Sequence, residues 1–540
     1  MSISLQQRVT AFVIVFLLVI GNVLLVSGLL HIPNSVGSSD VYQHIVKMST
    51  RKFNSDTPSS SFSQHFQSKG FTVIPNSDDQ ESIFMFLGDE ELQQLKTLLS
   101  SSTDHCWNQD LKILYSSSSQ KKETHIMTEN HETLEDENDI EMTREIILAQ
   151  FDPSLKKELL KLYSGFNRVP KDYPNLDNIN NYLKGLEQRF PGRAKMMKIT
   201  KEPTFEKRHI YGVKISNHVE QERDVPNILI VSAHHAREIN TVITSIVIIE
   251  KLLSDSNKFG NILQDYQIYI IPVVNVDGYH YVFSTNNWWR KNRRFVGYHN
   301  GTKSFGVDLN RNYDIGFEKC AGNDSLNSDV YKGEFAFSEI ETSSIRDFAK
   351  RVGGFSKVLD FHSLGRQVLT GYTCTWNAQQ DYIVKLGEEL ASKANNYKTR
   401  VPHADGEHQE YYIKQYTSYS FLIEIMDSFQ PPFSESVKES IELMPLMEHF
   451  LNKAIPLRGH VYDRDTGKPL SHVNIQIVGI DWKAGESRHT NHFGSYYLFL
   501  PPNMEYELVF SHKVGTMLKT KTVRVRLGQD DASQVLDVHL

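Results

Sequence analysis

His235 and Glu238 are the residues of this sequence whose types and spacing first suggest chemistry. They lie three residues apart at the expected start of a helix, so both side chains leave the same face and can reach one ion. A neutral imidazole and a carboxylate are ligands that Zn²⁺ accepts, with a third protein ligand and a water still to be supplied. One His-x-x-Glu match also arises by chance in a chain of this size, so the pair alone leaves both interpretations open.

The segments around this pair predict a strand followed by a helix. Residues 228–233 are apolar and β-branched, as in a buried strand, and residues 239–253 carry apolar side chains at helical intervals. Further helices are expected at residues 176–190 and 382–394, and further strands at 210–215, 266–276, 356–361 and 419–426. Alternating strands and helices predict a layered α/β domain with its ligands at one edge of the sheet.

His362 ends one of the expected strands and is a candidate third ligand. A histidine in such a place is more often a hydrogen-bonded edge residue. The topology favours the ligand, because His235 and His362 then follow strands at the same edge. Two histidines and one glutamate with an open fourth position are typical of a catalytic zinc, not of a structural one.

Glu424 is a single carboxylate in the otherwise apolar strand at 419–426. Burial of a lone glutamate costs several kcal/mol unless the group is paired or protonated, so the position needs a reason. A structural ion pair is one interpretation. A general base beside a metal-activated water is the other.

Two further segments carry arginines. Residues 288–294 combine tryptophans with several cations, which fits a surface patch, whereas a net charge of -7 for the chain gives no reason to expect nucleic acid as a partner. Residues 308–313 could form a simple turn. Arg311 beside Asn310 could also clamp a carboxylate, which suits a substrate with a free C-terminus.

Six blocks between about residues 170 and 456 together resemble the zinc metallocarboxypeptidase family, of the carboxypeptidase A/B and N/E types. The blocks are residues 235–238, 272–279, 289–293, 306–312 and 362–363, and Glu424. The resemblance implies a mixed twisted sheet flanked by helices, the metallocarboxypeptidase fold, over residues 166–455.

The resemblance also implies a role for each matching residue. His235, Glu238 and His362 would bind one Zn²⁺ per chain, and Glu424 would activate the attacking water. The substrate would be contacted by residues from three of the other blocks. Arg293 is expected at the scissile carbonyl, Asn310 and Arg311 at the terminal carboxylate, and Arg237 upstream of the cut.

The specificity pocket departs from the family pattern. Counting back from Glu424 places the pocket position at Gln409, which resembles the N/E group and its preference for terminal Lys or Arg. Where that group has an aspartate, this chain has Thr373, so a strong basic preference is not supported. Family members carry a mobile tyrosine seven residues before the pocket position, and this chain has Pro402 there. Tyr397 is the first candidate for that tyrosine, and Tyr411 and Tyr412 are weaker candidates.

The composition is that of an ordinary globular protein. The chain has 540 residues, 39% hydrophobic and 23% charged, which favours two to four folded units. Its three cysteines, Cys106, Cys320 and Cys374, are too few for a disulfide scaffold, although one bridge can form.

The N-terminal region predicts entry into the secretory route. After a short tail at residues 1–9, residues 10–30 lack charge and are long enough for a transmembrane signal anchor, or else contain a cleaved signal peptide. Residues 31–165 are polar and serine-rich, typical of a partly disordered stalk or of a pro-region, with a strand expected at 70–74 and a helix at 89–99. Two glycosylation sequons, at Asn300 and Asn323, fit the same route.

Short strands between turns follow from residue 456 to residue 540 and predict an all-β sandwich. The region resembles the transthyretin-like domain of N/E-type carboxypeptidases. The predicted function is therefore a zinc carboxypeptidase that removes single residues from peptide or protein C-termini, secreted or membrane-anchored. The alternatives are a related zinc deacylase and an inactive or weak pseudocarboxypeptidase that serves as a binding protein.

Overall fold

The computed structural model describes residues 173–374, 377–480, 486, 488–529 and 532–540, and the backbone of six strands between residues 12 and 116. The chain divides into two compact units, residues 1–156 and 157–540, and each is described by itself.

In the first unit two strands occupy most of the segment expected to be a membrane anchor or signal peptide. β1 (Phe12–Ile20) and β2 (Val23–His31) pair antiparallel. The sequence Gly21-Asn22 between them is typical of a tight turn, which explains why the apolar run divides. Among the described residues, no helix combines the length and the apolar character that crossing a bilayer requires.

An antiparallel sheet lies within the region predicted to be a stalk or pro-region. Its strands, in spatial order β4-β5-β3-β6, are β3 (His44–Ser49), β4 (Thr72–Pro75), β5 (Ser82–Leu87) and β6 (Leu111–Ser116). The strand expected at 70–74 is confirmed as β4. The helix expected at 89–99 lies outside the described residues.

The second unit is built on an eight-stranded mixed sheet in the order β15-β14-β16-β13-β9-β10-β8-β7. Its strands are β7 (Ala194–Lys198), β8 (Tyr211–Ile215), β9 (Asn227–Ser232), β10 (Gln267–Ile271), β13 (Lys357–Ser363), β14 (Gln367–Leu369), β15 (Lys398–Arg400) and β16 (Tyr419–Ile425). The four central strands β10, β9, β13 and β16 run parallel, so their carboxyl ends meet at one edge. The predicted mixed sheet is confirmed.

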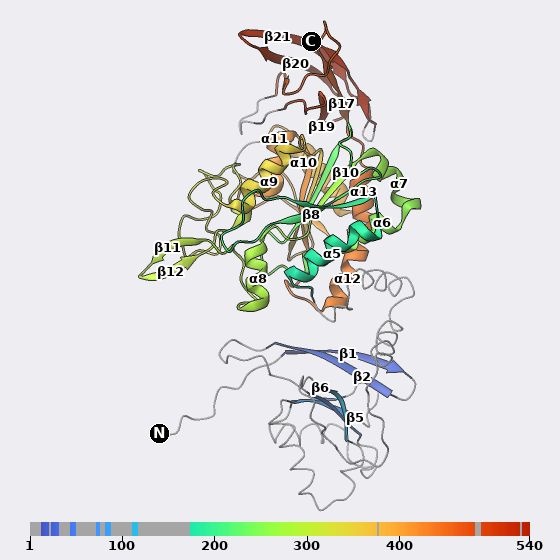
Figure 1. Cartoon of the computed structure of the whole chain (residues 1–540), viewed down its shortest axis with the longest axis vertical. Helices are drawn as coiled ribbons and strands as arrows, with labels where there is room; N and C mark the ends of the chain where they lie inside the picture. Colours follow the sequence, from blue (N-terminus) through green and yellow to red (C-terminus); the bar gives the residue numbers. More distant parts are fainter. Residues whose placement is uncertain are drawn as a thin grey trace, which may run out of the picture. The chain divides into compact units, whose positions relative to one another are not determined.

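Helices lie around this sheet (Figure 1). They are α5 (Leu176–Arg189), α6 (Asn240–Ser254), α7 (Ser256–Asp265), α8 (Val276–Ser284), α9 (Ile340–Arg351), α10 (Gln380–Ala391), α11 (His408–Tyr416), α12 (Phe433–Glu442) and α13 (Met444–Asn452). A hairpin of β11 (Phe295–His299) and β12 (Thr302–Phe305) and the short 3-10 helix η1 (Leu309–Arg311) complete the domain.

The central strands form because their residues are apolar on both faces, and all six residues of β9 are buried. One expected segment differs from the structure. Residues 266–276 were expected to be strands, but β10 ends at Ile271 and α8 begins at Val276. Pro272 cannot donate to a strand ladder, and the Asn275 side chain caps α8 by accepting a hydrogen bond from the Gly278 amide at 3.0 Å.

The C-terminal region contains only strands among its described residues, in two small sheets. One has the order β19-β17-β22 with β23 also on β17, and the other has the order β18-β20-β21. The strands are β17 (Leu457–Tyr462), β18 (Asn474–Ile477), β19 (Ser495–Leu498), β20 (Glu505–Val514), β21 (Met517–Arg526), β22 (Gln534–Val535) and β23 (Val538–His539). Both sheets contribute to one core, with Leu457 and Leu498 from the first and Ile475 and Leu508 from the second. The region is therefore rich in strands, with two small sheets packed on a shared core.

A disulfide joins Cys320 to Cys374, across 54 residues of the second unit. We expect Cys320→Ser to lower the free energy of unfolding by about 4 kcal/mol, because the bridge restricts the unfolded chain. Urea denaturation of the two proteins measures the difference. Dithiothreitol should reduce the stability of the unmutated protein but not that of the variant, and equal stability of all samples would contradict the prediction.

Candidate functional site

The structure brings His235, Glu238 and His362 together at the carboxyl edge of the sheet. His235 lies in the loop after β9, Glu238 lies just before α6, and His362 belongs to β13. His235 Nδ1 is 2.8 Å from Glu238 Oε1 and 3.0 Å from His362 Nδ1, and His362 Nδ1 is 3.1 Å from Glu238 Oε2. All three side chains are buried. These separations approach the roughly 3.3 Å expected between ligands of a tetrahedral zinc ion, so the residues fit the metal.

A buried aspartate and a partly buried arginine stand next to these ligands. Asp308 Oδ1 lies 3.1 Å from His235 Nε2, and Arg290 donates to Asp308 Oδ2 at 3.2 Å from Nε and 2.8 Å from Nη2. Arg290 Nη1 is also 3.8 Å from Glu238 Oε1. Burial alone would raise the pKa of Asp308, but Arg290 and His235 hold it well below its usual value. Asp308 is therefore an anion that orients His235.

Glu424 lies one strand away from the ligands. β13 and β16 are parallel, and their register places His362 opposite Glu424. The Glu424 Oε2 atom is buried and forms no hydrogen bond with a described residue. Burial and the neighbouring charge of Glu238 raise the pKa of Glu424 to about 8. A carboxylate without a partner and with a pKa near neutrality can accept and return a proton.

Asn310 and Arg311 lie in η1 and contact the start of α11. The Asn310 side-chain oxygen accepts a hydrogen bond from the His408 amide at 2.8 Å. Arg311 Nη1 donates to Glu407 Oε1 at 3.0 Å, and Gln409 Nε2 donates to Glu407 Oε2 at 2.6 Å. Glu407 thus joins the predicted carboxylate clamp to the predicted pocket residue.

Comparison with known proteins agrees with this geometry. Residues 179–440 match the model of the family described as Zinc carboxypeptidase. Carboxypeptidase A1 of Bos taurus is 30% identical over 303 residues, which cover 52% of this chain and 70% of that protein. A Zinc carboxypeptidase of Simulium vittatum is 32% identical over 232 residues, which cover 42% of this chain and 73% of that protein.

This chain belongs to the zinc carboxypeptidase family. It is a metallocarboxypeptidase, and the family's cofactor is one zinc ion. A crystal structure of carboxypeptidase A from Helicoverpa armigera aligns with a TM-score of 0.48 and 20% identity, covering 76% of this chain and 98% of that one.

The structure does not place Arg293 as the sequence predicted. Its Nε atom lies 3.3 Å from Glu206, and its guanidinium stacks on Tyr281, Trp289 and Phe305 at 3.7, 4.7 and 5.1 Å from the ring centroids. Arg290, in the same motif, lies beside the zinc ligands instead. Arg290 therefore replaces Arg293 as the candidate for the scissile carbonyl.

Two other predicted substrate contacts lie elsewhere or use other partners. The Tyr397 hydroxyl donates to Glu439 Oε1 at 2.8 Å, so it is bound to α12. Arg237 stacks on Phe429, with 4.4 Å between the guanidinium carbon and the ring centroid, and burial lowers its pKa. Its Nε atom is buried without a hydrogen bond to a described residue, so it still has a donor to offer.

Sequence reasoning did not assign Arg290, Asp308 or Glu407 to the site. Arg290 and Asp308 stand within the motifs that carried the resemblance, and the ion pair between them, at 2.8 Å, is visible only in the fold. One sequence feature could have indicated Glu407 as a site residue: it lies two residues before Gln409, the predicted pocket position.

We expect Arg290→Lys to lower kcat/KM for a peptide substrate by about 10²- to 10³-fold, the usual effect of losing a donor at a developing oxyanion. Arg293→Lys is the matched control and should change kcat/KM by less than about threefold, because its partners are Glu206 and aromatic rings. Steady-state kinetics with zinc content measured in each sample make the comparison. A larger loss in Arg293→Lys would restore the original assignment.

Proposed function

We propose that this protein hydrolyses the C-terminal peptide bond of peptides or proteins, with zinc held by His235, Glu238 and His362. One observation carries the proposal: three buried ligand atoms converge within one strand of an unpartnered glutamate. A bound zinc ion supplies Lewis-acid polarisation and makes its water more acidic. Glu424 takes the proton of the attacking water and returns it to the leaving amine.

Arg290 stabilises the negative charge that develops on the scissile carbonyl oxygen. Its guanidinium is largely shielded from water and is fixed by Asp308, so it needs little reorganisation during the reaction. Burial alone would lower the pKa of Arg290, but Asp308 and Glu238 raise it, so the group remains a cation.

Arg311 and Asn310 hold the terminal carboxylate of the substrate, which restricts cleavage to the last residue. Glu407 already occupies Arg311, so the substrate carboxylate shares or displaces this contact. Gln409 and Glu407 border the pocket for the terminal side chain. Arg237 contacts the residues upstream of the cut.

We further propose that the protein acts in the secretory pathway or outside the cell. The Cys320–Cys374 bridge supports an oxidising compartment, and Asn300 and Asn323 are exposed acceptors for glycosylation. An N-terminal anchor or signal peptide at residues 10–30 and a transthyretin-like identity for the C-terminal sandwich belong to the same proposal.

The alternatives have less support. A zinc deacylase would share the zinc ligands, but it would have no need of Arg311 to bind a terminal carboxylate. An inactive homologue would be expected to lose a ligand or the base, and this chain keeps all of them.

Glu424→Gln should keep one zinc per chain and lower kcat by about 10²- to 10⁴-fold, because the amide cannot take a proton. Glu424 acts in its deprotonated form, so the activity of the unmutated protein should rise with pH as this group titrates. A nearby zinc ion would lower the pKa of Glu424, so the rise should be centred below the pH of about 8 at which this group titrates without the metal. The variant should lack this rise. Glu388→Gln, an exposed residue of α10, is the control, and full activity of Glu424→Gln would refute the assignment.

Arg311→Ala should lower kcat/KM for peptides with a free C-terminus by about 10- to 100-fold, because a charge-assisted bond of roughly 1.5–3 kcal/mol is lost. Amidated versions of the same peptides should be poor substrates for both proteins. Chromatography of the released residue measures each rate. The clamp hypothesis fails if the unmutated protein cleaves amidated and free peptides equally well.

A further inference from the structure

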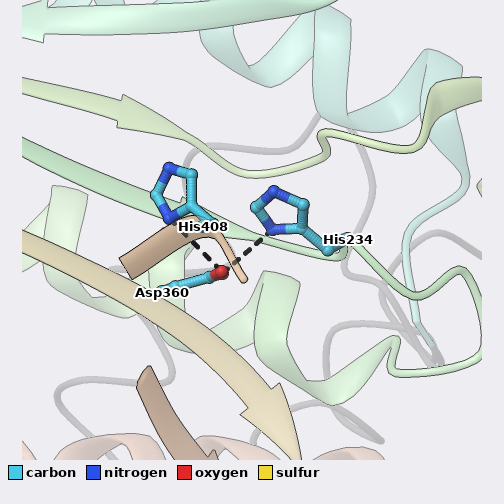
Figure 2. A group of neighbouring side chains, drawn as sticks. All are labelled: His234, Asp360 and His408. Atoms are coloured by element: carbon cyan, nitrogen blue, oxygen red, sulfur yellow. Dashed lines mark hydrogen bonds and ion pairs between the residues drawn. The ribbon is translucent and has the colours of Figure 1, made fainter. Parts of the chain in front are cut away.

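A second group of buried polar side chains lies behind His362. It consists of His234, Asp360 and His408, hereafter the Asp360 cluster (Figure 2). All three side chains are fully buried. His234 Nδ1 is 3.1 Å from Asp360 Oδ1, and His408 Nδ1 is 3.3 Å from Asp360 Oδ2. None of these residues belongs to the zinc ligands or contacts the proposed position of the substrate through its side chain.

Asp360 faces a zinc ligand. Side chains two residues apart on a strand point to the same face, and Asp360 precedes His362 by two residues in β13. Asp360 Oδ2 lies 3.1 Å from His362 Nε2. Neither atom has a hydrogen bond of good geometry to a described residue, so their contact is a close electrostatic one between a carboxylate and an imidazole.

Each of the two zinc histidines has an aspartate behind it, His235 through a hydrogen bond and His362 through a close contact. Each directs Nδ1 toward the other ligands, and each has its Nε2 atom 3.1 Å from a buried aspartate, Asp308 for His235 and Asp360 for His362. The aspartates differ in how they are held. Asp308 is bound by the Arg290 guanidinium, whereas among the described residues no lysine or arginine forms an ion pair with Asp360.

We propose that Asp360, held by His234 and His408, is a positioning residue that sets the affinity of His362 for zinc. The inference rests on the proposed zinc site. Asp360 keeps the proton of His362 on Nε2, which leaves the Nδ1 lone pair for the metal and fixes the plane of the ring. Its negative charge, without a neighbouring lysine or arginine, also favours a cation on the far side of the imidazole.

His234 and His408 keep the Asp360 carboxylate in place from two different elements. His234 follows β9, and its Nε2 atom is 3.0 Å from the Tyr313 hydroxyl, so both of its ring nitrogens have a partner. His408 is the first residue of α11 and packs on the His234 ring, with 4.9 Å between the centroids. Loss of either imidazole frees the carboxylate to rotate away from His362.

A second divalent cation inside the Asp360 cluster is the competing interpretation, since its three donors lie within 4.8 Å of one another. The contacts favour the positioning role, because Asp360 Oδ2 already faces His362 and His234 is hydrogen-bonded through both nitrogens. The two interpretations predict different metal contents.

The test measures zinc binding by the full chain. Zinc content is determined by atomic spectroscopy, and the Kd for Zn²⁺ by competition with a chromophoric chelator. The unmutated protein should bind one zinc, and Asp360→Asn should raise the Kd about 10- to 100-fold. Asp277→Asn is the matched control, a fully buried aspartate of α8 that binds Arg208 at 3.0 Å. It should lower thermal stability and leave the Kd for zinc unchanged.

His408→Phe is the second variant, because it keeps an aromatic ring against Tyr313 and Tyr412 and removes the contact with Asp360. It should raise the Kd by about three- to tenfold.

Folding of each variant is checked by near-ultraviolet circular dichroism without metal. If the Kd of Asp360→Asn for zinc is within threefold of the unmutated value, this inference is wrong and the proposed function still stands. The inference is also wrong if the unmutated protein binds two zinc ions and Asp360→Asn binds one. That result would show that the Asp360 cluster itself binds a cation. No zinc in the unmutated protein would overturn the proposed function as well.

Discussion

The balance of buried charge at the carboxyl edge of β9, β13 and β16 is the constraint on which the rest of the site depends. Glu238, Asp308 and Asp360 are almost completely shielded from water there, and Glu424 lies beside them, whereas Arg290 is the cation that contacts this group. Unpaired buried charges cost several kcal/mol each, so such an edge is unfavourable without a further cation. A divalent ion held by the proposed ligands His235, Glu238 and His362 would supply that charge. By this argument the metal would help to stabilise this arrangement of carboxylates.

The sequence predicted the elements that bring these groups together. Apolar β-branched runs predicted the central strands, and the strand that ends in His362 and the strand that carries Glu424 both lie where expected. The spacing of His235 and Glu238 placed them in one loop at the same edge. These predictions succeeded because they depend on local periodicity and on one rule of topology, that parallel strands end together.

What the sequence could not supply was the direction of side chains within a motif. Arg290 and Arg293 lie three residues apart in one irregular segment, and only the fold shows that the first turns to Asp308 and the second to Glu206. Glu407 reaches Arg311 across 96 residues of sequence. The N-terminal apolar run is long enough for a membrane span, and the sequence did not predict that β1 and β2 pair within it. The anchor or signal peptide at residues 10–30 stays a prediction.

The first turn of α11 connects the two halves of the proposed site. The His408 amide binds Asn310 while its ring lies against Asp360, and the preceding Glu407 binds Arg311. The Glu407 amide in turn donates to Glu410 at 3.1 Å, within the same turn. The proposed carboxylate clamp and the Asp360 cluster thus both depend on the position of this one turn, since Glu407 and His408 are neighbours at its start.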